Sequence, residues 1–65
     1  MNMTHRFRPG QSVRLRGGYP YRDAAEGSYE IIRQLPQDGG EYQYRIKNSR
    51  EEHERVVKEH ELERA

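Results

Sequence analysis

The segment 37–40, Gln-Asp-Gly-Gly, is the feature that most restricts the fold of this 65-residue chain. An Asp-Gly pair supplies the positive φ angles that a tight turn between two antiparallel strands needs. The flanking segments, 28–35 and 41–47, are rich in β-branched and aromatic residues, and 41–47 alternates strictly between apolar and polar positions. A β-hairpin is therefore predicted. Adjacent Ile31 and Ile32 break the alternation and indicate either a bulge or a strand covered on both faces.

A first strand is predicted before this hairpin. Pro9-Gly10 is a turn signal, and residues 12–16 then alternate polar and apolar side chains, so that Val13 and Leu15 face inward. The connection 17–27 contains three glycines and a proline, which argue against a helix there.

The last third of the chain supports two interpretations. Residues 49–52 fit a helix capping box, with Ser49 as the cap and Glu52 reaching back. The apolar residues that follow, Val56, Val57 and Leu62, do not form a helical stripe. We expect a single helical turn near 50–53 and then one or two short strands. The alternative is a three-stranded antiparallel sheet with a C-terminal helix.

Size and composition predict one small domain. Hydrophobic residues make up 31% of the chain and charged residues 35%, with a net charge of +1, so the core is thin but the apolar runs are patterned. We expect a flexible tail over 1–6 and one domain over 7–63. The absence of cysteine fits a reducing cytoplasm. No apolar run approaches the roughly 20 residues of a membrane span, so a cytoplasmic protein without a membrane partner is expected.

The order of the expected elements resembles an SH3-like small barrel of the Tudor and KOW sort. The start, Phe7-Arg8-Pro9-Gly10-Gln11-Ser12-Val13, looks like the F-x-P/V-G-x-x-V opening of such barrels. The chain is also similar to a family of short uncharacterised bacterial proteins, through the runs Gly27-Ser28-Tyr29-Glu30-Ile31-Ile32, Leu35-Pro36, Tyr44-Arg45-Ile46-Lys47, Glu54-Arg55-Val56-Val57 and Glu61-Leu62.

This resemblance implies a mainly β barrel of about five short strands in which the first and last strands lie side by side. It implies no catalytic residue. The chain has no tryptophan and no Ala-Leu-Tyr-Asp-Tyr motif, so binding of proline-rich peptides, as by signalling SH3 domains, is not implied.

The loop 16–22 carries the principal candidate binding residues, because Tyr19 and Tyr21 stand there between two arginines. Tyrosine stacks on planar groups, and arginine pairs with carboxylate or phosphate. Outward strand positions add further cations. The candidate set is Arg14, Arg16, Tyr19, Tyr21, Arg22, Arg45 and Lys47.

Two of these patterns also have plain structural interpretations. The outward cations, with Arg33, form a basic stripe if neighbouring strands align them. Side-by-side first and last strands would instead bring arginines near Glu59, Glu61 and Glu63, and such pairs would cancel the stripe. The recurring tyrosines Tyr29, Tyr42 and Tyr44 either offer a stacking platform for bases or fill the core.

The sequence argues against an enzyme. Its serines have no histidine within local reach, and no glycine-rich loop opens a helix in a phosphate-binding pattern. The spacing of His5, His53 and His60 matches no standard zinc pattern, so no metal, cofactor or small-molecule substrate is expected.

We expect a protein-interaction module, with another protein or a second copy as its partner. The alternative is a binder of RNA or DNA, which the five arginines and single acid of residues 1–25 favour.

Overall fold

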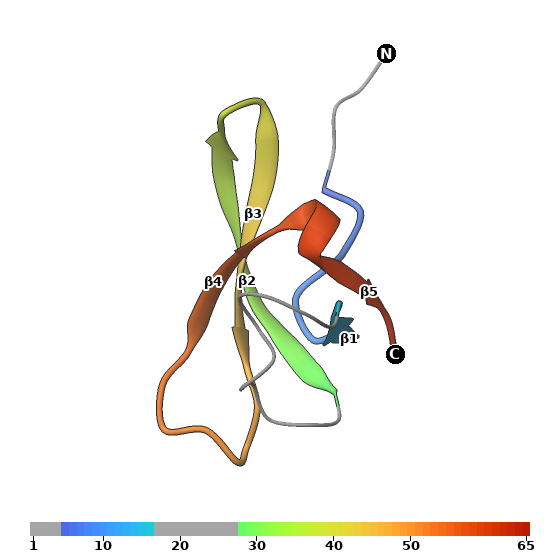
Figure 1. Ribbon diagram of the computed structural model, residues 1–65, viewed down its shortest axis with the longest axis vertical. Helices are drawn as coiled ribbons and strands as arrows, with labels where there is room; N and C mark the ends of the chain where they lie inside the picture. The colour runs from blue at the N-terminus through green and yellow to red at the C-terminus, as the bar shows by residue number, and fades with distance from the viewer. Residues whose placement is uncertain (1–4, 17–27) are drawn as a thin grey trace.

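The computed structural model describes residues 5–16 and 28–65, and these residues form a single antiparallel sheet with the strand order β4-β3-β2-β1-β5 (Figure 1). The mainly β fold with five strands is confirmed. Residues 1–4 of the expected tail and the connection 17–27 lie outside the described residues. The elements are β1 (Ser12–Leu15), β2 (Tyr29–Asp38), β3 (Glu41–Lys47), β4 (Arg55–Lys58), the 3₁₀ turn η1 (Glu59–Glu61) and β5 (Leu62–Arg64).

The predicted hairpin is the long β2–β3 pair. Asp38 and Glu41 are cross-strand partners at its end, and Gly39 and Gly40 between them have φ angles of 65° and 81°. The register shifts between Ile31 and Arg33, which bears out the bulge that the adjacent isoleucines indicated. β2 also continues beyond Pro36, because a second shift between Leu35 and Asp38 accommodates a residue that has no N–H for the ladder.

Replacing Gly39 with alanine is expected to lower the free energy of unfolding by about 1 kcal/mol, because an L-residue is strained at this positive φ. A Cβ atom at this position would meet nothing within 4 Å, so the cost comes from the backbone alone. Urea unfolding measures it, with Gln37→Ala at a nearby exposed position as the control that should change stability little. Equal unfolding midpoints for the two variants would show that the turn does not require glycine.

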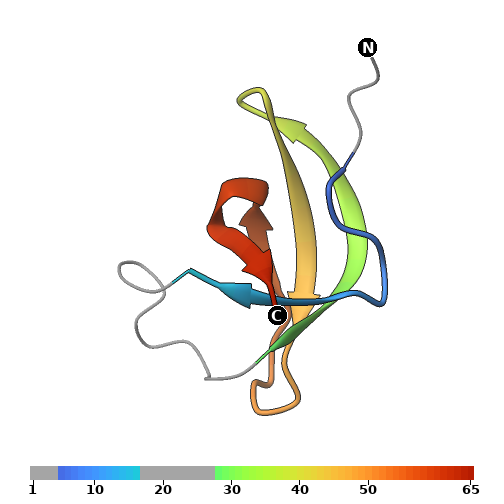
Figure 2. The ribbon, with the colours of Figure 1, turned by 90° about the vertical axis from the view of Figure 1, so that its right-hand side faces the viewer.

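The core lies inside the curled sheet. β1 and β5 cross the direction of the β2–β3 hairpin and face it (Figure 2). Buried side chains from both parts form one hydrophobic cluster. Leu15 and Tyr42 pack at its margin. The inward position predicted for Val13 is confirmed, and Tyr44 is buried, as the core interpretation of the hairpin tyrosines expected. The buried hydrophobic residues are Phe7, Val13, Tyr29, Ile31, Tyr44, Ile46, Val57 and Leu62.

β5 pairs with β1, with Leu62 opposite Leu15, so the first and last strands lie side by side as the resemblance implied. The C-terminal helix of the alternative interpretation does not form. Extended strands bury both Val57 and Leu62, whereas the apolar positions of this region do not lie on one face of a helix.

The helical turn predicted near 50–53 is wrong: the helical turn of the structure is η1, between β4 and β5. The capping box is not used because buried Asn48 organises the chain instead. Its side-chain oxygen accepts the Arg50 N–H at 2.7 Å and its carbonyl accepts the Glu51 N–H at 3.0 Å. This arrangement is an Asx-type turn that competes with helix formation.

Candidate interaction surface

Acidic residues stand opposite two of the candidate binding cations. Arg14 on β1 lies directly across from Glu63 on β5, and Lys47 on β3 lies directly across from Glu30 on β2. All four side chains are exposed. Directly opposed residues point to the same face of a sheet, and opposite charges there attract each other. The register expected from neighbouring first and last strands therefore sets Arg14 opposite Glu63.

Glu59 and Glu61 do not take part in such pairing, because they lie in η1 and not on β5. Arg16 is exposed, and its backbone N–H donates to the Glu61 carbonyl oxygen at 2.9 Å. The other members of the candidate set in this region, Tyr19, Tyr21 and Arg22, lie outside the described residues.

Arg45 lies in a different environment. Its Nη1 atom is 3.4 Å from Glu54 Oε1, and both side chains are substantially exposed, so this ion pair is weak. Directly across on β2 is a second arginine, Arg33, and directly across on β4 is Val56. The sheet thus sets two arginines directly opposite each other, and like charges at opposed positions cost stability.

A second cross-strand row lies beside this one. Leu35, Gln43 and Lys58 are opposed across the same three strands, and the side chain of Val56 in the first row is 50% exposed. Both rows lie on the sheet face that is turned away from the core. We call these residues the outer patch: Arg33, Leu35, Gln43, Arg45, Val56 and Lys58.

Sequence reasoning missed Val56 and Lys58 as surface candidates. A signal for Val56 was present, because adjacent valines on one strand point to opposite faces. Only one of Val56 and Val57 can enter the core of a single sheet, and Val57 does so.

The three tyrosines of the hairpin do not form an exposed stacking platform. Tyr29 and Tyr44 are buried, and Tyr42 is partly buried and packs against the core. The ring of His5 covers Tyr42 at a centroid distance of 4.0 Å and meets Tyr44 edge-on at 5.2 Å. These aromatic rings stabilise the fold.

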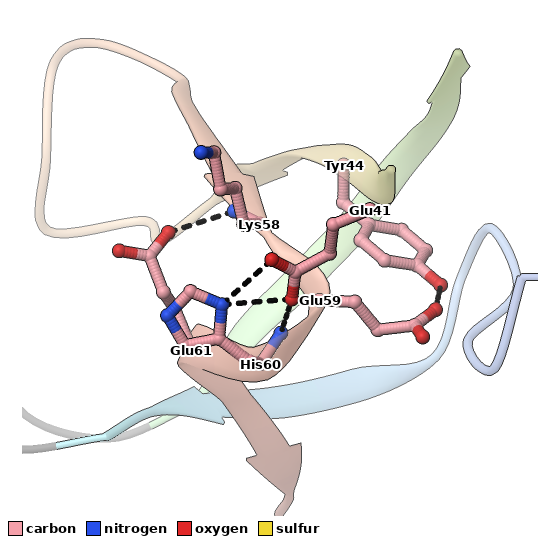
Figure 3. Close-up of polar contacts among 6 residues, drawn as sticks. All are labelled: Glu41, Tyr44, Lys58, Glu59, His60 and Glu61. Carbon is pink, nitrogen blue, oxygen red and sulfur yellow. Dashed lines mark hydrogen bonds and ion pairs between the residues drawn. The ribbon is translucent and has the colours of Figure 1, made fainter. Parts of the chain in front are cut away.

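The hydroxyl of Tyr44 ties the N-terminal segment to η1. It donates a hydrogen bond to the Glu59 carboxylate (Figure 3) and accepts the Phe7 N–H at 3.2 Å. The same carboxylate accepts the Arg6 N–H at 2.9 Å. Burial, and next the hydrogen bond to Glu59, raise the pKa of Tyr44 to about 12.

A second set of contacts fixes η1 against the hairpin (Figure 3). The Glu41 carboxylate accepts the His60 N–H at 2.7 Å and contacts His60 Nδ1 at 2.7 and 2.8 Å. The His60 backbone donor is the main reason why the pKa of Glu41 is lowered. Glu61 accepts the Lys58 N–H at 2.7 Å, which satisfies a backbone donor on the edge strand β4.

A cavity of about 430 Å³ is lined by Glu51, Glu52, His53 and Arg55. Arg55 donates two hydrogen bonds to Glu51, at 2.9 and 2.7 Å. Burial, followed by the side-chain interaction with Glu51, raises the pKa of the nearby Tyr29 hydroxyl. Glu51 and Arg55 neutralise each other in the cavity wall, and Glu52 adds one further negative charge.

Within residues 5–16 and 28–65 no three histidine, cysteine or acidic side chains are grouped to hold a metal ion. The same residues include no helix with the length and apolar character needed to cross a bilayer. Comparison of the chain with models of known protein families, with curated proteins and with solved structures yields no match.

Proposed function

We propose that this chain is a small, non-catalytic binding module whose partner is another protein or a second copy of itself. The contact surface includes the loop 16–22 and the neighbouring strands. One observation carries the choice of partner class: acids are interleaved with the cations of the described strands. Glu63 faces Arg14, and Glu30 faces Lys47.

This interleaving disfavours a nucleic-acid backbone as the ligand. A phosphate chain carries a closely spaced row of negative charges and binds by displacing counterions from an uncompensated basic face. Each acid beside a cation weakens that attraction and repels the neighbouring phosphate. Protein surfaces, in contrast, carry mixed charges and can match an alternating pattern.

A nucleic-acid binder remains the second candidate, and the pair Arg33 and Arg45 is the observation that favours it. These two arginines are directly opposed, and within residues 5–16 and 28–65 the one ion pair that either of them makes is the weak contact between Arg45 and Glu54. Both guanidinium groups could donate hydrogen bonds to one phosphate group. This site is local, and Val56 interrupts it on the next strand.

The proposed cellular location is based on the sequence. The lack of cysteine is compatible with work in the reducing cytoplasm of a bacterial cell. The proposal includes no cofactor, metal or small-molecule substrate.

An amide NMR titration of the labelled protein with a short single-stranded RNA of mixed sequence separates the two candidates. We expect no saturable shifts, even at low salt, because the acids of the strands offset the arginines. Saturable shifts centred on Arg33 and Arg45 that fade as salt is raised would contradict the proposal. Relaxation rates of the same sample over a range of protein concentrations show whether a second copy is the partner.

A further inference from the structure

We infer that the outer patch binds an acidic, amphipathic segment of another protein, with carboxylates placed on Arg33 and Arg45 and an aliphatic side chain on Val56. This inference rests on the proposed function, because it names the chemistry of the protein partner. It is carried by the charge pattern, the exposed apolar residue and the position of both on the sheet.

The charge pattern is unfavourable in the free protein. Arg33 and Arg45 are cross-strand partners, and directly opposed side chains on a sheet lie about 5 Å apart at Cβ. In the described part of the chain, the one ion pair that either arginine makes joins Arg45 to Glu54, at 3.4 Å. A carboxylate from a partner could accept hydrogen bonds from both guanidinium groups and remove the repulsion.

The apolar feature is Val56, the one large hydrophobic residue exposed in the described part of the chain. It continues the row from Arg45, and the neighbouring row adds partly buried Leu35 and Lys58. An aliphatic contact flanked by cations matches a segment that alternates aliphatic and acidic residues.

The sheet edge determines how such a segment can approach. Within residues 5–16 and 28–65, β4 pairs only with β3, so Val56 lies next to an open edge. The Lys58 N–H of that edge is already donated to Glu61 at 2.7 Å. The edge is thus partly capped, and the partner is recognised by side chains across the patch more than by an added strand.

An acidic protein segment fits this surface better than a phosphate chain does. The row of Arg33 and Arg45 ends at Val56, whose aliphatic side chain makes no favourable contact with a phosphodiester. Glu54 stands beside Arg45 and would repel a chain that carries a charge at every nucleotide. In a peptide, the spacing between acids can leave room for both Glu54 and Val56.

The test uses a labelled short peptide of alternating glutamate and valine, with fluorescence anisotropy for affinity and amide shifts for the site. We expect shifts centred on Arg33, Arg45 and Val56. The variants Arg33→Thr and Val56→Thr should each weaken binding about tenfold. Arg8→Thr is the matched control, because Arg8 is also exposed but lies outside both the outer patch and the proposed contact surface, and it should leave the affinity unchanged.

Three outcomes would overturn the inference: no binding of the glutamate–valine peptide, equal binding of a matched lysine–valine peptide, or equal weakening by Arg8→Thr. If the glutamate–valine peptide does not bind while the protein self-associates, the inference is wrong and the proposed function is still supported. If a short RNA instead saturates the same residues and Arg33→Thr abolishes its binding, both fall.

A stability measurement separates a binding role of Arg33 from a structural one. Arg33→Thr removes the like-charge contact and keeps a residue suited to strands, so the melting temperature of the free protein should rise by about 3 °C. A variant that is more stable yet binds less would support the inference. A lower melting temperature would show that Arg33 serves the fold, and would overturn it.

Discussion

The variant Tyr44→Ala is expected to be largely unfolded at room temperature. Tyr44 is fully buried, its ring meets Phe7 edge-on at 5.5 Å, and its hydroxyl holds both Phe7 and Glu59. Truncation of a large buried aromatic side chain costs about 4 kcal/mol. The core of a domain of this size supplies only about 3–5 kcal/mol of stability, so little or none would remain.

Circular dichroism and the dispersion of amide NMR signals measure this loss. Tyr42→Ala is the matched control, because Tyr42 is on the same strand and face but only partly buried; this variant should still fold. Tyr44→Phe keeps the ring and loses only the hydroxyl, with an expected cost of about 1 kcal/mol. A cooperative thermal transition for Tyr44→Ala close to that of Tyr42→Ala would contradict the central place of Tyr44 in the core.

Stability is expected to fall steeply as the pH rises from 10 to 12. The folded protein holds the pKa of Tyr44 at about 12, against about 10 in an unfolded chain. Between these values the folded state keeps a proton that the unfolded state releases, so the free energy of unfolding decreases with rising pH. The loss of stability that ionisation of Tyr44 causes is absent below pH 10, grows through this range and reaches about 2–3 kcal/mol above pH 12.

Chemical denaturation at a series of pH values measures this dependence, and tyrosinate absorbance follows the ionisation directly. The raised pKa of Tyr29 acts in the same direction, so the total loss exceeds the share of Tyr44. Tyr44→Phe separates the loss due to Tyr44 from the rest, because this variant should lose stability less steeply between pH 10 and 12. If the free energy of unfolding fell equally steeply with pH for the wild type and Tyr44→Phe, the ionisation of Tyr44 would not be the cause of the loss.

Local turn chemistry made the hairpin predictable. Asp38-Gly39-Gly40 provides the positive φ angles at the sharpest reversal of the chain, and the strict alternation of β3 then fixes which of its side chains enter the core. The neighbourhood of β1 and β5 followed from the resemblance to SH3-like barrels, because no local pattern links residues so far apart in sequence.

The C-terminal third was less predictable, since its local signals conflict with its burial. Ser49 and Glu52 match a capping box when the local sequence is considered alone. In the structure the side chain of Asn48 accepts the Arg50 N–H instead, and nothing in the sequence marks Asn48 as buried. The actual 3₁₀ turn forms where Glu59 and Glu61 find donors contributed by Tyr44 and Lys58. One of those contacts is long-range and is invisible in a local window.

The outer patch also depended on information that the sequence does not contain. Its cross-strand rows require the register between β2, β3 and β4, and the apposition of Arg33 and Arg45 requires knowing where the bulge lies. The sequence indicated outward arginines on the first three strands, but not which of them would be neighbours.

The register shift between Ile31 and Arg33 has a consequence for how this surface can change over evolutionary time. Residues two apart on a regular strand share a face, so without the extra residue Arg33 would follow Ile31 towards the core. The shift turns Arg33 outward and places Gln34 opposite buried Tyr44. The outer patch is therefore set by the number of residues in β2 as well as by their identity. A one-residue insertion or deletion there would rearrange the surface more than most substitutions within it, so any comparison of related sequences must align the bulge before it compares the arginines.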